Sequence, residues 1–181
     1  MSIIDAEPIE THGTTTPSPN KRNGLEAIAQ ELRSLVKANA RGELSALRRI
    51  DPDHPSKGAL FRILARADLA EMGIDSLKRW AAATHIMAQR PDVLKPGDLG
   101  KSLAAIRISS SRIDMLLNAR GDTLRDLVRR TARRLARSEE ALPYRELCQL
   151  VLMDGQPDKD NAADELRIKI AQSYQRATRK S

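Results

Sequence analysis

Aromatic side chains are almost absent from this sequence of 181 residues, in which one Phe, one Trp and two Tyr make up 2% of the chain. Because β-strands favour aromatic and β-branched residues, this scarcity argues against a large sheet. Leu, Ala and Arg, which are strong helix formers, are abundant instead. The composition therefore predicts an all-α protein with a core of Leu, Ile, Val and Ala.

Cysteine and long apolar segments are also scarce. Cys148 is the single cysteine, which excludes an intramolecular disulfide and a cysteine-based zinc site. No apolar run approaches the ~20 residues that a membrane-spanning helix needs, and residues 1–10 lack the pattern of a signal peptide. We therefore expect a cytoplasmic protein without a membrane partner.

Motifs for catalysis and for cofactors are missing as well. The sequence contains no Walker-type loop, no GxGxxG and no HExxH, and Ser109–Ser111 lack a glycine elbow. Asp51, Asp53 and His54 are possible metal ligands, but the two prolines of DPDHP favour a turn with an Asx-type hydrogen bond. We predict a protein that is not an enzyme and that holds no cofactor and no metal.

Apolar residues recur at helical spacing along most of the chain, which predicts about nine helices. We expect Asp98 and Asp122 to be N-caps, Ser111 and Asp114 to form a capping box, and Gly121 to adopt a positive φ. The helices are expected over residues 25–40, 43–50, 57–70, 76–90, 99–106, 111–120, 123–137, 143–153 and 162–176.

Two segments suggest how the chain is divided. Residues 1–22 are rich in Thr, Pro, Ser and Asn, which predicts a disordered tail. The segment PDVLKPGD near mid-chain has the composition of a boundary. We therefore expect two small helical lobes, an N-terminal one over 23–91 and a basic C-terminal one over 98–181.

Positive charge is concentrated in one window. The net charge is +7, and the 37 residues from Lys101 to Arg137 contain ten basic and three acidic side chains, so this window holds the whole excess. The remainder of the chain is neutral. A localised positive field indicates a polyanionic partner.

The helix expected over 123–137 carries most of this charge. Leu124, Leu127 and Val128 lie on an apolar stripe, and the opposite half holds six arginines: Arg125, Arg129, Arg130, Arg133, Arg134 and Arg137. Arginines at i and i+4 repel each other, so folding gains nothing from this arrangement. The guanidinium fork suits bidentate phosphate contact, which predicts a track for a nucleic-acid backbone. The alternative is a solvated helix face whose arginines pair with acids of neighbouring helices.

The order of several segments resembles the CasB family, the small subunit of the type I-E CRISPR Cascade complex. These segments are GELSALRRI at 42–50, LFRIL at 60–64, DLGKSLAAIRISSSRIDMLLNARGDTLRDLVRRTARRLA at 98–136, and YRELCQLVL at 144–152. The resemblance implies an all-helical protein of two lobes, present as two copies beside the backbone subunits and the large subunit. Its basic surface is expected to run along the guide RNA and the target DNA and to hold the displaced strand.

The resemblance also suggests contact residues, namely Arg49, Arg112, Arg129 and Arg130, with Lys101 as a further candidate. Together with the helix face, the candidate nucleic-acid-binding residues are Arg49, Lys101, Arg112, Arg125, Arg129, Arg130, Arg133 and Arg134. The chain departs from the family in the tail 1–22 and in the acidic stretch after the penultimate helix.

Two other functions remain open from the sequence. The helix pair around Gly121 suits a stand-alone helix-turn-helix regulator, although a recognition helix needs base-reading side chains such as Asn, Gln or Ser. A scaffold protein whose arginines bind acidic partner proteins is the second alternative. Salt-dependent binding to bare nucleic acid would separate the scaffold from the main hypothesis.

Overall fold

The computed structural model describes residues 21–56 and 58–179, and it confirms the all-α prediction. Nearly all of the predicted tail over 1–22 lies outside the described residues. The described part of the chain contains nine α-helices: α1 (Lys21–Lys37), α2 (Arg41–Arg48), α3 (Gly58–Arg66), α4 (Ile74–Ala88), α5 (Leu99–Ala105), α6 (Ser110–Asn118), α7 (Gly121–Ala136), α8 (Tyr144–Met153) and α9 (Asp160–Thr178).

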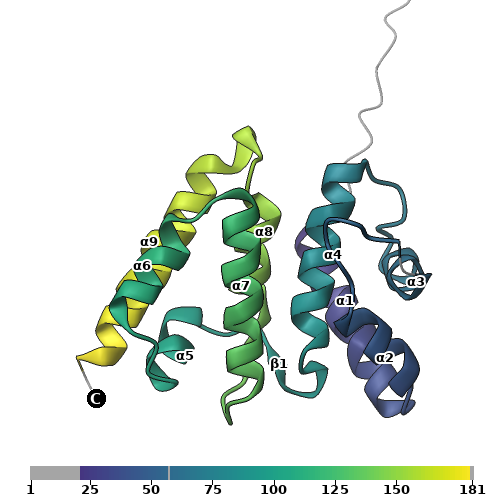
Figure 1. Cartoon of the computed structure of the whole chain (residues 1–181), viewed down its shortest axis with the longest axis horizontal. Helices are drawn as coiled ribbons and strands as arrows, with labels where there is room; N and C mark the ends of the chain where they lie inside the picture. The colour runs from purple at the N-terminus through teal and green to yellow at the C-terminus, as the bar shows by residue number, and fades with distance from the viewer. Residues whose placement is uncertain (1–20, 57, 180–181) are drawn as a thin grey trace, which may run out of the picture.

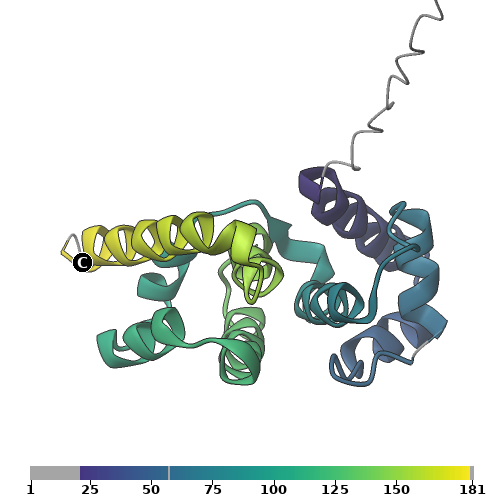
Figure 2. The same cartoon turned by 90° about the horizontal axis from the view of Figure 1, so that it is seen from above.

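The helices form two groups that lie side by side, α1–α4 and α5–α9 (Figure 1). In the second group α6 and α7 overlie α9 and α8 in Figure 1, and the view from above shows that they occupy separate layers (Figure 2). None of the described helices is long and apolar enough to cross a membrane.

Helix α4 lies at the junction of the two groups. Every residue from Trp80 to Ala88 is buried, because α4 contacts α7 and α8 on one side and α1 and α2 on the other. The buried side chains of both groups form one continuous hydrophobic cluster. The segment predicted as a lobe boundary contains the short 3-10 helix η1 (Pro91–Val93) and the strand β1 (Leu94–Lys95).

A two-residue parallel bridge is an element that the periodicity did not indicate. Strand β1 pairs with β2 (Leu142–Pro143) in the register Leu94 with Leu142 and Lys95 with Pro143. Two residues are too few to produce an alternating pattern, so this pairing depends on where the chain brings the segments together.

The helix ends test three sequence predictions. Asp98 is the N-cap of α5, since its Oδ1 accepts from the backbone N–H of Lys101 at 3.0 Å. The capping box at Ser111 is wrong, because α6 begins one residue earlier and Ser109 is its N-cap. Gly121 has the predicted positive φ of 56°.

The cap predicted at Asp122 is wrong as well. Helix α7 begins at Gly121, so Asp122 lies within its first turn and Arg120 is the N-cap residue. The carboxylate of Asp154 accepts from the backbone N–H of Gly121 at 2.8 Å. A residue distant in sequence therefore satisfies a donor at this helix end, which a local pattern does not indicate.

Polar contacts join the two groups of helices at several points. The hydroxyl of Tyr144 donates to Glu26, Arg33 donates to the carbonyl of Leu94 at 3.0 Å, and Arg125 donates to Asp53 at 3.3 Å. The bond from Tyr144 joins α8 to α1, the bond from Arg33 joins α1 to β1, and the bond from Arg125 holds the arginine-bearing helix α7 against the loop after α2.

Candidate nucleic-acid interface

Helix α7 is oriented by a stripe of fully buried side chains. Leu124, Val128, Ala132 and Leu135 have no exposed surface, and the helix contacts α4, α6 and α8. Burying a side chain of Val or Leu size contributes about 1.5–3 kcal/mol, so this stripe fixes the rotation of the helix. Leu127, which the sequence placed on the same stripe, is only partly buried and lies on its flank.

The six arginines of α7 differ in their surroundings. Arg125 donates to Asp122 and to Asp53, and Arg129 donates to Asp126. Their side chains are only 23% and 29% exposed. Both arginines therefore lie partly covered and paired at the junction with the first group of helices, which reduces the charge they offer to a ligand.

The other four arginines are exposed, and among the described residues no carboxylate pairs with any of them. These are Arg130, Arg133, Arg134 and Arg137. Arg134 donates to the carbonyl of Ile106, at 3.4 Å. The first half of α7 is therefore partly neutralised, by two aspartates of the same helix and by Asp53 of the loop after α2, whereas its second half is not.

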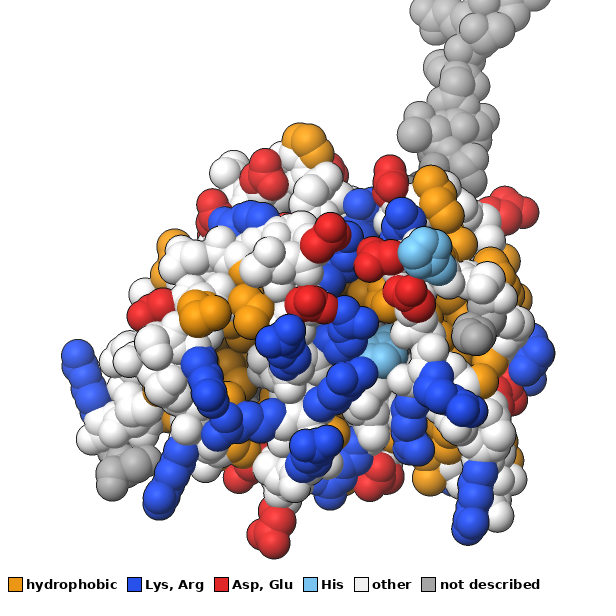
Figure 3. Space-filling model, viewed as in Figure 1, with side chains coloured by type: hydrophobic (Ala, Val, Ile, Leu, Met, Phe, Trp, Pro, Cys, Tyr) orange, Lys and Arg blue, Asp and Glu red, His pale blue; other side chains and the backbone are white. Residues whose placement is uncertain are grey.

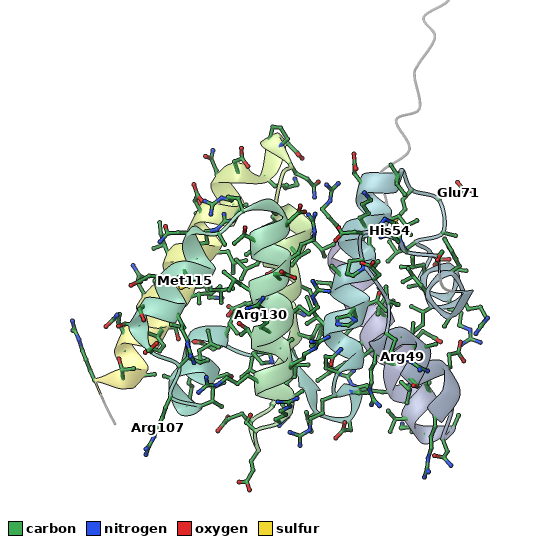
Figure 4. All side chains as sticks on the ribbon, in the orientation of Figure 1. Arg49, His54, Glu71, Arg107, Met115 and Arg130 are labelled. Atoms are coloured by element: carbon green, nitrogen blue, oxygen red, sulfur yellow. The ribbon has the colours of Figure 1, made fainter. Side chains whose placement is uncertain are left out.

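The same distribution is visible on the molecular surface. Figure 3 shows basic side chains gathered on the face that carries α7, with carboxylates above them. Figure 4 places Arg49 beside α2 and Arg130 on α7, so cations come to this side from both groups of helices. Arg49 is exposed, and its Nε donates to the carbonyl of Ser45 at 3.2 Å within its own helix.

Two further candidates lie on α5 and α6. Arg112 is exposed on α6 and lines a pocket together with Arg130 and Arg134, so the structure brings these three predicted residues together. Lys101 is exposed on α5 and is not among the residues that line this pocket. The structure therefore gathers some of the candidates and leaves Lys101 apart from the pocket.

Sequence analysis did not select Arg107, which the structure exposes in the turn between α5 and α6. Its φ of 53° lies in the left-handed region, which is uncommon for a residue other than glycine. The side chain extends from the lower edge of the molecule (Figure 4). Its position inside the basic window was the only signal that could have indicated it.

His85 reports on the electrostatics of the junction. It is buried in α4, and its Nε2 lies 3.2 Å from the side-chain nitrogen of Gln89. The pKa of His85 is lowered to about 4, chiefly by burial and also by the nearby charges of Arg133 and Arg129. Burial and the two arginines of α7 therefore both favour the neutral form of this histidine.

No group of three or more possible metal ligands occurs among the described residues. In the DPDHP turn, Asp51 accepts from the backbone N–H of Asp53 at 3.1 Å, which confirms the Asx-type hydrogen bond. The same carboxylate contacts the ring of His54 at 3.1 Å. Asp53 in turn binds Arg125, so these side chains have partners within the protein.

The fold and this surface define an all-helical protein with an arginine-rich face. A family model described as CRISPR-associated protein Cse2 matches residues 43–174, which is well over half of the chain, and the chain belongs to this family. The match confirms the resemblance to the small subunit of type I-E Cascade, and the protein is a subunit of a CRISPR Cascade complex. Searches among curated proteins and among solved structures gave no match.

Proposed function

We propose that this subunit is non-catalytic and binds the sugar-phosphate backbones of the guide RNA and target DNA, and that it stabilises the displaced DNA strand. The observation that carries the proposal is the set of exposed arginines on the second half of α7 that have no carboxylate partner among the described residues. Arg112 and Arg49 extend this surface on either side. Lys101 is a more distant member, and Arg125 and Arg129 contribute less because aspartates already hold them.

The chemistry of the face supports contact with phosphate. Exposed arginines one turn apart, such as Arg130 and Arg134, repel each other by a few tenths of a kcal/mol, and phosphates between them would remove that repulsion. The basic face of α7 has no Asn or Gln that could distinguish bases. Binding through such a face is independent of sequence, which suits a complex in which RNA–DNA pairing selects the target.

The family implies further contacts within the complex, and we include them in the proposal. The partners are the Cascade backbone subunits, the large subunit and a second copy of this chain. A pure scaffold function is the second candidate. The ion pair between Arg125 and Asp53 favours this function, because in this pair an arginine of α7 binds a carboxylate. In that case the exposed arginines would contact acidic surfaces of other subunits.

A salt titration of binding to long single-stranded DNA separates these two functions. We expect Arg130→Ala/Arg134→Ala to weaken binding and to lower the slope of log affinity against log salt by about 0.7 for each lost phosphate contact. Both side chains are exposed, so the melting temperature should not fall. The matched control is Arg176→Ala/Arg179→Ala, which removes two exposed arginines at the end of α9 and should change the slope less.

If the Arg130/Arg134 variant keeps the affinity and the salt slope of the wild type, the exposed half of α7 is not the nucleic-acid surface. Retained DNA binding together with loss of incorporation into the Cascade complex would assign these arginines to partner subunits. A footprint confined to one palindromic site would instead support a stand-alone regulator.

A further inference from the structure

An open pocket lies between α5, α6 and α7, beside the exposed arginines. Its volume is about 320 Å³, and most of its lining is apolar. Met115 on α6 and Arg130 on α7 come from the two helices on either side of it (Figure 4). The lining residues are Leu103, Ile108, Arg112, Ile113, Met115, Leu116, Leu127, Arg130, Thr131 and Arg134.

The pocket leaves apolar surface in contact with solvent. Met115 is 58% exposed at its rim, and Leu127 and Thr131 on α7 are only partly buried. Apolar surface is visible among the basic side chains on this face (Figure 3). Since complete burial of a Met or Leu side chain would stabilise the protein by about 1.5–3 kcal/mol, an apolar pocket that the fold leaves open indicates a binding site.

The charges at the rim restrict the chemistry of the occupant. Arg112, Arg130 and Arg134 line the pocket, and its lining contains no carboxylate. A suitable ligand is therefore anionic at its edge and flat or apolar in its body. A nucleotide of a single strand has this combination, because its base is a planar hydrophobic group between two phosphates.

The pocket is also continuous with the surface assigned to the nucleic-acid backbone. Arg130 and Arg134 belong to both, so a strand that follows α7 passes the mouth of the pocket. Bases of single strands stack on guanidinium planes as well as on aromatic rings. The pocket is lined by three guanidinium groups, those of Arg112, Arg130 and Arg134. The bases of a duplex are paired and stacked, so they are unavailable to it.

We propose that this pocket receives one unpaired base of a single-stranded nucleic acid while Arg112, Arg130 and Arg134 bind the adjoining phosphates. The inference rests on the proposed function and adds a preference for strands with accessible bases. It gives a physical basis for holding a displaced strand in preference to duplex DNA.

The experiment compares two oligonucleotides of equal length and charge, one of thymidines and one of abasic sites, in binding to the full chain. Stacking of a base contributes about 1–3 kcal/mol, so the thymidine strand should bind roughly 5- to 150-fold more tightly. Thr131→Met fills the pocket without changing charge, and it should remove this preference while leaving the salt slope unchanged. The matched control is Thr123→Met, an exposed position near the start of the same helix.

The outcomes distinguish the pocket from the arginine surface. Equal affinity of the wild type for both strands would overturn the proposal that the pocket binds a base, and it would leave the proposal of backbone binding intact. This comparison uses the wild type alone, so it does not depend on whether a variant folds. Failure to bind either strand would overturn the proposed function together with the pocket. If Thr131→Met retains the preference but no longer joins the other Cascade subunits, the occupant is a protein side chain and the nucleotide assignment is wrong.

Discussion

Gly100 permits a close approach of α5 to α9, and replacing it should destabilise the protein strongly. A Cβ atom at this position would lie 2.3 Å from the carbonyl oxygen of Ile170, 2.6 Å from the backbone nitrogen of Tyr174 and 2.8 Å from Cβ of Ser173. Real Cβ contacts are essentially never shorter than 3.0 Å. Two of these atoms belong to the backbone of α9, so α5 and α9 must separate.

The magnitude follows from what lies around this contact. Overpacking of a core costs about 1–3 kcal/mol. Separation would also stretch the hydrogen bonds from Ser173 to Asp98, at 2.6 Å, and from Tyr174 to the carbonyl of Ile108, at 2.6 Å. Each contributes about 1 kcal/mol, while alanine regains about 1 kcal/mol of helix propensity. We therefore expect Gly100→Ala to lower the free energy of unfolding by about 3 kcal/mol.

Urea denaturation followed by circular dichroism measures this difference, and the melting temperature should fall by about 6–12 °C, at roughly 2–4 °C per kcal/mol for a chain of this size. The control is Gly42→Ala in α2, where no heavy atom lies within 4 Å of the added Cβ. That substitution should stabilise the protein by up to about 1 kcal/mol. If the two variants unfold at the same urea concentration, the close approach of α5 and α9 is wrong.

Two further predictions concern titratable groups at the junction of the helix groups. The hydrogen bond from Tyr144 is the largest cause that lowers the pKa of Glu26, so Tyr144→Phe should cost about 1 kcal/mol at pH 7 and less as Glu26 becomes protonated below pH 4.5. Urea denaturation at pH 7 and pH 3.5 checks this, and an equal cost at both values would contradict it. For His85 the folded pKa of about 4 lies below the ordinary 6.5, so the unfolded chain binds more protons between these values and the protein loses stability as the pH falls from 6.5 towards 4. Between pH 7 and pH 5 the wild type should lose about 2 kcal/mol more than His85→Gln, and identical pH profiles would show that His85 is not buried in its neutral form.

The sequence was sufficient to locate the helices, because helical periodicity is a local property. The nine expected helices all occur, and the ends of α7 differ from the prediction by only one or two residues. Asp98 was recognised as a cap because its partner, Lys101, lies three residues away. The bond from the carboxylate of Asp154 to the backbone N–H of Gly121 was not predicted, because Asp154 lies 33 residues away, at the C-terminal end of α8.

The sequence also identified the helix that carries the charge, but it treated its six arginines as equivalent. Periodicity places each side chain around the helix axis and contains no information about which neighbours surround that helix. Leu127 illustrates this limit, since it shares the apolar arc of Val128 yet lines the open pocket.

Tertiary packing decided which charges remain available. Arg125 is paired because the loop after α2 brings Asp53 to it from 72 positions away in the chain, whereas no described carboxylate reaches Arg130. The apolar pocket likewise exists only because α5, α6 and α7 meet with a gap between them. The amino-acid sequence determined the positions of the helices and the positive charge of α7. The packing of those helices against one another determined which arginines are exposed to solvent, because ion pairing and solvent access depend on distances between segments remote in sequence.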